Sequence, residues 1–163
     1  MLIDRKNMIE YSIEDRFNYK NNGWFTLYVV LVKYKNELLL KIGYCGNESV
    51  LGRLAWNKYY NDGYHINGKR GGWFDDEWNR KRIDQIVEPE KIIDEVQIFG
   101  KENTKKLEYV LRNMCVSFNF PNGVNFSGKT EYVYYNKETI NTIQTFLNRL
   151  KKSERFKTKE LCY

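Results

Sequence analysis

Four side chains of this sequence have the chemical character to act on a phosphodiester, and they follow one another in the order Tyr28, Lys41, Arg53 and Glu108. A lysine beside a tyrosine favours the phenolate, which can serve as a general base. An arginine offers a planar fork of donors that suits phosphate oxygens. One glutamate is enough for a Mg²⁺ ion that keeps most of its waters. Phosphodiester hydrolysis needs an activated water, neutralised negative charge and a cation at the leaving oxygen, so the set is consistent with that reaction.

A β-hairpin and two helices must position these side chains. Residues 24–34 are β-branched and aromatic, and residues 37–44 resume that pattern after the polar Lys35-Asn36. This predicts a hairpin with Tyr28 on its first strand and Lys41 on its second. Apolar residues at helical spacing predict a helix over 48–60 that carries Arg53. A regular apolar stripe predicts a second helix over 103–118 that carries Glu108.

The remaining elements complete a small α+β domain. The glycine-rich residues 61–73 predict a loop that presents Lys69 and Arg70. The pattern also predicts a short helix over 73–87, a third strand over 92–99, a short strand over 131–135 and a last helix with residues 140–150 on its apolar face. We therefore expect a mixed or antiparallel sheet of three or more strands flanked by helices. The chain is one domain, with an N-terminal arm (1–22), a core (24–135) and a C-terminal helix with a basic tail (137–163).

Composition favours a polyanionic partner and excludes several classes of site. The 163 residues carry a net charge of +6 and 16 per cent aromatic residues, and aromatics can stack on exposed bases. A single histidine excludes a multi-histidine metal site, and three widely spaced cysteines argue against a thiolate zinc site. The sequence has no Walker A loop and no GxSxG elbow. It also has no long apolar run and no signal-like start, so we expect a cytoplasmic protein without a membrane partner.

The order and spacing of four motifs resemble the GIY-YIG nuclease superfamily. The first motif stands as Leu27-Tyr28-Val29, and the second as Lys41-Ile42-Gly43, the lysine form seen in some restriction enzymes and phage relatives. The segment Leu107-Glu108-Tyr109-Val110-Leu111 looks like the glutamate helix of that family. Gly128-Lys129-Thr130-Glu131-Tyr132 is similar to the ending of a phage and bacterial subgroup. The resemblance covers residues 24–135.

The resemblance implies a set of site residues. Tyr28, Lys41, Arg53 and Glu108 would share one catalytic face, with Tyr44 and Tyr59 as further catalytic candidates, and Glu108 would bind Mg²⁺ or Mn²⁺. Gly43 completes the second motif, and His65, Asn122 and Asn125 lie where relatives carry a histidine or an asparagine near the site. Glu131 is expected to be structural rather than a metal ligand.

The function that the resemblance implies is a Mg²⁺-dependent endonuclease acting on double-stranded DNA, as a restriction or phage-encoded enzyme that works as a monomer or a homodimer. The residues expected to hold DNA phosphates are Lys69, Arg70, Arg149, Lys151, Lys152, Arg155 and Lys157. Two alternatives stay open: a non-catalytic nucleic-acid-binding module on the same fold, and an RNA-directed nuclease. Each residue alone also has an ordinary explanation: Tyr28 can pack in the core, and Glu108 can pair in helix register with Lys105 or Arg112.

Overall fold

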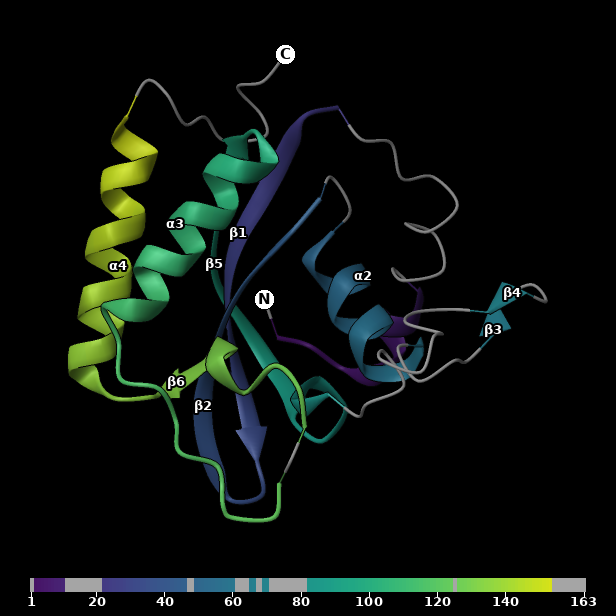
Figure 1. The fold of residues 1–163 in the computed structure, drawn as a ribbon. Helices are drawn as coiled ribbons and strands as arrows, with labels where there is room; N and C mark the ends of the chain where they lie inside the picture. Colours follow the sequence, from purple (N-terminus) through teal and green to yellow (C-terminus); the bar gives the residue numbers. More distant parts are fainter. Residues whose placement is uncertain are drawn as a thin grey trace.

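A four-stranded antiparallel sheet forms the centre of the molecule (Figure 1). The computed structural model describes residues 2–10, 22–46, 49–60, 65–66, 69–70, 82–124 and 126–153. The strands are β1 (Trp24–Tyr34), β2 (Glu37–Cys45), β5 (Glu88–Phe99) and β6 (Tyr132–Tyr134), in the order β5-β1-β2-β6. Every neighbouring pair in this sheet is antiparallel. The predicted α+β class is confirmed.

The predicted hairpin is formed by β1 and β2. Its turn is Lys35-Asn36, and Lys35 has a φ of 53°, a left-handed conformation that lets two residues reverse the chain. The register pairs Tyr28 with Gly43 and Val30 with Lys41. Side chains of directly paired residues lie on the same face of a sheet, so Tyr28 and Lys41 share a face.

Each face of the sheet is covered by helices of its own (Figure 1). Helix α2 (Val50–Ala55) and the helical residues 5–10, which include Met8, pack against the sheet face that carries Tyr28, Val30 and Val32. Helices α3 (Lys101–Asn113) and α4 (Lys137–Lys152) pack against the opposite face, which carries Leu27, Val29 and Ile42. Strand residues that alternate between two apolar layers explain why both hairpin strands are almost continuously buried.

The observed elements differ from the predicted ones mainly at their ends. Residues 50–55 are α-helical, and a π-helix, η1 (Trp56–Tyr60), continues them. Helix α3 stops at Asn113 rather than 118, because the chain then turns to pair Ser117 with Val133 of β6. The third strand is longer than predicted and begins at Glu88. Part of the helix predicted over 73–87 lies outside the described residues, and residues 83–85 form a 3₁₀ turn, η2 (Ile83–Gln85).

The N-terminal arm is more than a peripheral segment where it is described. Leu2 bridges to Lys91, Ile3 N–H donates to the Glu90 carbonyl at 3.0 Å, and Met8 is buried under the sheet. In the predicted loop, β3 (His65–Ile66) and β4 (Lys69–Arg70) pair as two short antiparallel strands.

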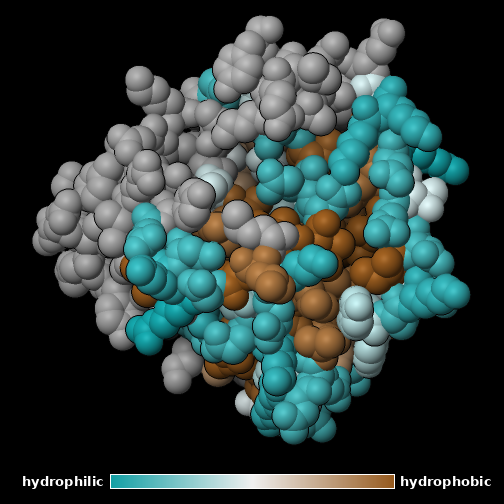
Figure 2. Space-filling model, turned by 180° about the vertical axis from the view of Figure 1, so that it is seen from behind, coloured by the Kyte–Doolittle hydropathy of each residue, from teal (hydrophilic) through white to brown (hydrophobic). Residues whose placement is uncertain are grey.

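The surface is mixed in character. Seen from behind, hydrophobic residues gather in the middle of the face and hydrophilic residues surround them (Figure 2). None of the helices in the described part of the chain is both long enough and apolar enough to cross a membrane.

Candidate functional site

Lys41 lies at the centre of a buried group of charged and aromatic side chains. Its side chain comes from the middle of β2, and the residue is 1% exposed. The Nζ atom lies 2.6 Å from Oδ1 of Asp84 and 3.8 Å from Oε2 of Glu131. It also lies 5.9 Å from the ring centres of both Tyr28 and Tyr132. The predicted neighbourhood of Tyr28 and Lys41 is therefore confirmed.

Asp84 is the counter-ion of Lys41, and the sequence pattern did not reveal it. Its Oδ1 accepts hydrogen bonds from the Lys41 ammonium and from the Tyr132 hydroxyl, and its Oδ2 accepts from Arg82 Nε at 3.0 Å. No motif or spacing signal marks this residue, because its contacts with Lys41 and Tyr132 join segments more than 40 residues apart. For Tyr132 the sequence did carry a signal, because this residue ends the Gly128-Lys129-Thr130-Glu131-Tyr132 motif.

The turn that carries Asp84 is fastened at several points. Arg82 N–H donates to Gln85 Oε1 at 2.8 Å, and Ile83 N–H donates to the Ser127 carbonyl at 2.9 Å. Lys58 Nζ, from the π-helix η1 that follows α2, donates to the Gln85 carbonyl of η2 at 3.3 Å and to the Val87 carbonyl at 2.6 Å. The backbone of η2 is thus bonded both to the segment before β6 and to η1.

Gly43 is required by the position of Tyr28. A Cβ atom on residue 43 would lie 2.7 Å from the Tyr28 hydroxyl oxygen and 2.8 Å from ring atom Cζ. No side chain fits at that separation. The glycine of the second motif therefore has a packing reason: it lets the tyrosine ring of β1 lie flat across β2.

Burial, rather than Lys41, decides the protonation of Tyr28. Burial raises the pKa of the Tyr28 hydroxyl above its usual range, and the opposing charge of Lys41 lowers it by less. Burial is the largest single effect and would lower the pKa of Lys41, but the charges of Asp84, Tyr28 and Glu131 and the hydrogen bond to Asp84 together outweigh it, so the net shift is upward. The prediction of a Tyr28 phenolate is therefore wrong, because the net shift of the Tyr28 pKa is upward. Lys41 acts in the predicted direction, but its charge is already balanced by Asp84.

Glu108 approaches this group from α3. Its residue is 6% exposed, and Arg112 Nε lies 2.8 Å from its Oε1. The pairing of Glu108 with Arg112 in helix register, one of the alternatives from the sequence, is thus present. Burial raises the pKa of Glu108 to about 7, against the opposing charge of Arg112 and with a further increase from Glu131.

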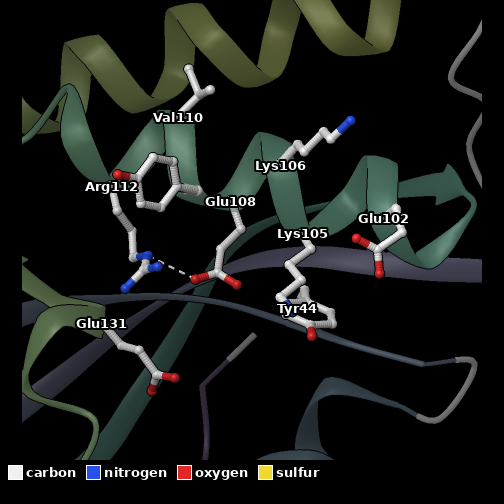
Figure 3. Close-up of a pocket in the computed structure, with 9 residues that line it drawn as sticks. Tyr44, Glu102, Lys105, Lys106, Glu108, Val110, Arg112 and Glu131 are labelled. Carbon is white, nitrogen blue, oxygen red and sulfur yellow. Dashed lines mark ion pairs between the residues drawn. The ribbon is translucent and has the colours of Figure 1, made fainter.

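A pocket of about 610 Å³ opens beside Glu108 (Figure 3). Tyr44, Glu131 and Arg112 line it together with residues of α3. Figure 3 shows one Glu108 oxygen facing Arg112 and the other directed away from it. Of the predicted site residues, the pocket brings Tyr44 and Glu108 together.

Glu131, expected to be structural, also belongs to the buried group of charged side chains around Lys41. It ends the 3₁₀ turn η3 (Lys129–Glu131), and its Oε2 lies 3.4 Å from Arg82 Nη2. Burial raises the pKa of Glu131, and the charge of Lys41 opposes the shift. The acidic members of the group are Asp84, Glu108 and Glu131, and the basic members are Lys41, Arg82 and Arg112. Fully ionised, these six side chains balance to zero.

The other predicted residues fall into three groups. Arg53 lies on α2, which packs against the face of Tyr28, and its side chain is partly buried. On the surface, Asn122 lies in an exposed turn, and Arg149, Lys151 and Lys152 are exposed on α4, where Lys151 pairs with Asp94 at 2.6 Å. Outside the described residues lie Asn125, Arg155, Lys157 and the side chains of Tyr59, His65, Lys69 and Arg70.

The donor set fits a Mg²⁺ ion and does not fit a site built wholly from protein ligands. Among the described residues, no group of three or more histidine, cysteine, aspartate or glutamate side chains is placed to hold a metal. Mg²⁺ keeps several waters and needs one or two carboxylates. Burial disfavours the ionised form of the Glu108 carboxylate and so raises its pKa. A bound cation would stabilise that ionised form.

Comparisons of the chain with protein-family models, with curated proteins and with solved structures find no match in any of the three.

Proposed function

We propose that this chain is a Mg²⁺-dependent endonuclease that hydrolyses DNA phosphodiester bonds at the pocket beside Glu108. One observation carries the proposal: Tyr28, Lys41 and Glu108, separated by up to 80 positions in the sequence, lie in or beside one charged group that opens on a pocket. The volume of that pocket, about 610 Å³, is in the range of small-ligand sites, about 300–1,000 Å³.

In the reaction we propose, accessible residues contact the metal and the phosphate, and buried residues act through their charge and packing. Glu108 would hold Mg²⁺, which when bound supplies a Lewis acid and a polarised water. Arg112, which is 21% exposed on its side chain, faces the pocket and offers its guanidinium to phosphate oxygens. Arg53 is not among the residues that line this pocket, and its role as a second phosphate-binding arginine is proposed from the resemblance alone.

Tyr28 and Lys41 lie behind this contact surface. Both are at most 2% exposed, so their contribution is electrostatic and structural. The Tyr28 phenol stays protonated near neutral pH, because burial raises its pKa. It therefore acts as a neutral group, and the water must be activated elsewhere in the site.

The experiment incubates purified protein with plasmid DNA and, separately, with RNA, each in Mg²⁺ or in EDTA. We expect cleavage of DNA that depends on Mg²⁺, and loss of cleavage in Glu108→Gln with DNA binding retained. Glu102→Gln is the matched control, because Glu102 is an exposed carboxylate on the same helix and the same pocket wall. Cleavage of RNA alone would favour the RNA-directed nuclease. Binding without cleavage of either would favour the non-catalytic module.

A second readout tests the metal without using activity. A ligand that binds only the folded protein stabilises it, by about 2.7 kcal/mol at 100 times its Kd. Mg²⁺ should therefore raise the melting temperature of the wild-type protein and of Glu102→Gln, and raise it less in Glu108→Gln. An equal increase in all three proteins would remove Glu108 from metal binding.

A further inference from the structure

Asp84 is a buried carboxylate whose oxygens are all engaged. It is 5% exposed, and its donors come from three separate elements: Lys41 on β2, Tyr132 on β6 and Arg82 at the start of η2. The function proposed above gives Asp84 no part, although its contact with Lys41 is at 2.6 Å. A carboxylate in this position controls where the lysine nitrogen lies and whether it is charged.

We propose that Asp84 is a positioning residue of the site: it fixes the Lys41 ammonium between the rings of Tyr28 and Tyr132 and keeps it charged. The result is an ammonium that is paired with Asp84 and held at a fixed position 3.8 Å from Glu131, one of the carboxylates that line the pocket. This inference rests on the proposed function, because the charge matters to the reaction only if phosphodiesters are cleaved there.

Lys41 needs such a partner because of its surroundings. A lysine side chain has four flexible carbon–carbon bonds and no planar group to orient it, and burial favours its neutral form. Charged and titratable groups from five elements surround the Lys41 ammonium. They are Asp84 from η2 and Arg82 immediately before it, Glu131 from η3, Tyr132 from β6, Tyr28 from β1 and Glu108 from α3. Asp84 has the largest favourable effect on the pKa of Lys41.

The protonation of the network follows from the same contacts. Asp84 stays ionised, because the charges of Lys41 and Arg82 and the hydrogen bonds from Lys41 and Tyr132 together lower its pKa by more than burial raises it. Tyr132 stays neutral, because burial and the charge of Asp84 raise its pKa. The network therefore has one arrangement near neutral pH, with a charged lysine, an ionised aspartate and two neutral tyrosines.

The position of Asp84 is itself well determined. In the backbone of η2, the Ile83 N–H donates to the Ser127 carbonyl at 2.9 Å, and the Gln85 carbonyl accepts from Lys58 Nζ at 3.3 Å. The side chain of Gln85 closes the turn on the Arg82 N–H at 2.8 Å. These bonds give Asp84 the rigid support that a positioning residue requires.

The test compares the pH dependence of cleavage in wild type, Asp84→Asn and a matched control. Asparagine keeps the shape of the side chain and removes its charge. We expect kcat of Asp84→Asn to fall by about tenfold or more at pH 7, with KM little changed. A new basic limb should appear as the lysine, which keeps Glu131 at 3.8 Å but has lost its 2.6 Å partner, loses its proton, with a further tenfold loss per pH unit. Asp94→Asn is the control, because it also removes the aspartate of a 2.6 Å aspartate–lysine pair, but at a partly exposed position outside the site.

A measurement on the side-chain nitrogen of Lys41 covers the case in which Asp84→Asn does not fold. The Nζ resonance, assigned with Lys41→Arg, should remain that of an ammonium up to about pH 10 in wild type and in Asp84→Glu. A neutral amine below about pH 9 in the wild-type protein would overturn the proposal.

The outcomes separate the inference from the proposed function. Wild-type protein that cleaves neither DNA nor RNA overturns the proposed function, and the inference falls with it. Wild-type protein that cleaves, together with a folded Asp84→Asn that keeps the wild-type pH profile, overturns the inference alone.

Discussion

Replacing Glu108 by glutamine is expected to stabilise the protein at alkaline pH and not at acidic pH. Burial raises the pKa of this carboxyl from 4.5 to about 7 in the folded protein. Between these two values the folded protein holds a proton that the unfolded chain has released. The free energy of unfolding therefore falls as the pH rises from about 4.5 to about 7, and it stays low above that window.

The size of the effect follows from the shift. One pH unit corresponds to 1.36 kcal/mol, so the ionised Glu108 costs on the order of 3 kcal/mol at pH 8. The raised pKa already includes the opposing charge of Arg112, so the loss of that ion pair is not subtracted again. Glutamine avoids the cost of the buried charge, and the net gain at pH 8 is about 3 kcal/mol, or about 6–12 °C in Tm for a chain of this length.

The assay is urea unfolding of wild type, Glu108→Gln and Glu102→Gln at pH 5 and pH 8, without divalent cations. The gap between Glu108→Gln and wild type should open between the two pH values, and Glu102→Gln should follow wild type at both. A gap of the same size at pH 5 and pH 8 would refute the reasoning, because it would show that Glu108 ionises in the folded protein as it does in the unfolded chain.

Three further predictions concern the hairpin and the surface. Gly43→Ala should destabilise the protein by about 1–3 kcal/mol in urea unfolding, because its Cβ would lie 2.7 Å from the Tyr28 oxygen; wild-type stability would contradict this contact. Tyr28→Phe should leave the shape of the pH–rate profile unchanged between pH 6 and 9, because burial keeps the phenol protonated, whereas loss of a basic limb would show that Tyr28 does titrate there. Lys105→Gln with Lys106→Gln, on the pocket wall, should reduce the slope of log affinity for DNA against log salt by about 1.8, whereas Lys151→Gln should change it little because Lys151 already pairs with Asp94; equal slopes for both variants would contradict this assignment.

The sequence alone determined the parts of the site that depend on local geometry. Nearly continuous apolar runs on either side of the polar Lys35-Asn36 are sufficient to predict a hairpin, and its register then places Lys41 and Tyr28 on one face. Likewise, four positions along a helix bring Glu108 and Arg112 together. These contacts follow from the periods of strands and helices, which a sequence carries directly.

Tertiary structure alone decided which charges neutralise one another and which groups hold a proton. Asp84 reaches Lys41 across 43 positions and Tyr132 across 48, and no periodic pattern encodes such a contact. The protonation of Tyr28 depends on how completely α2, β6 and residues 5–10 exclude water from its face of the sheet. Desolvation is a property of the packed molecule, so the sequence could predict the direction in which Lys41 acts on Tyr28 but not that burial would outweigh it.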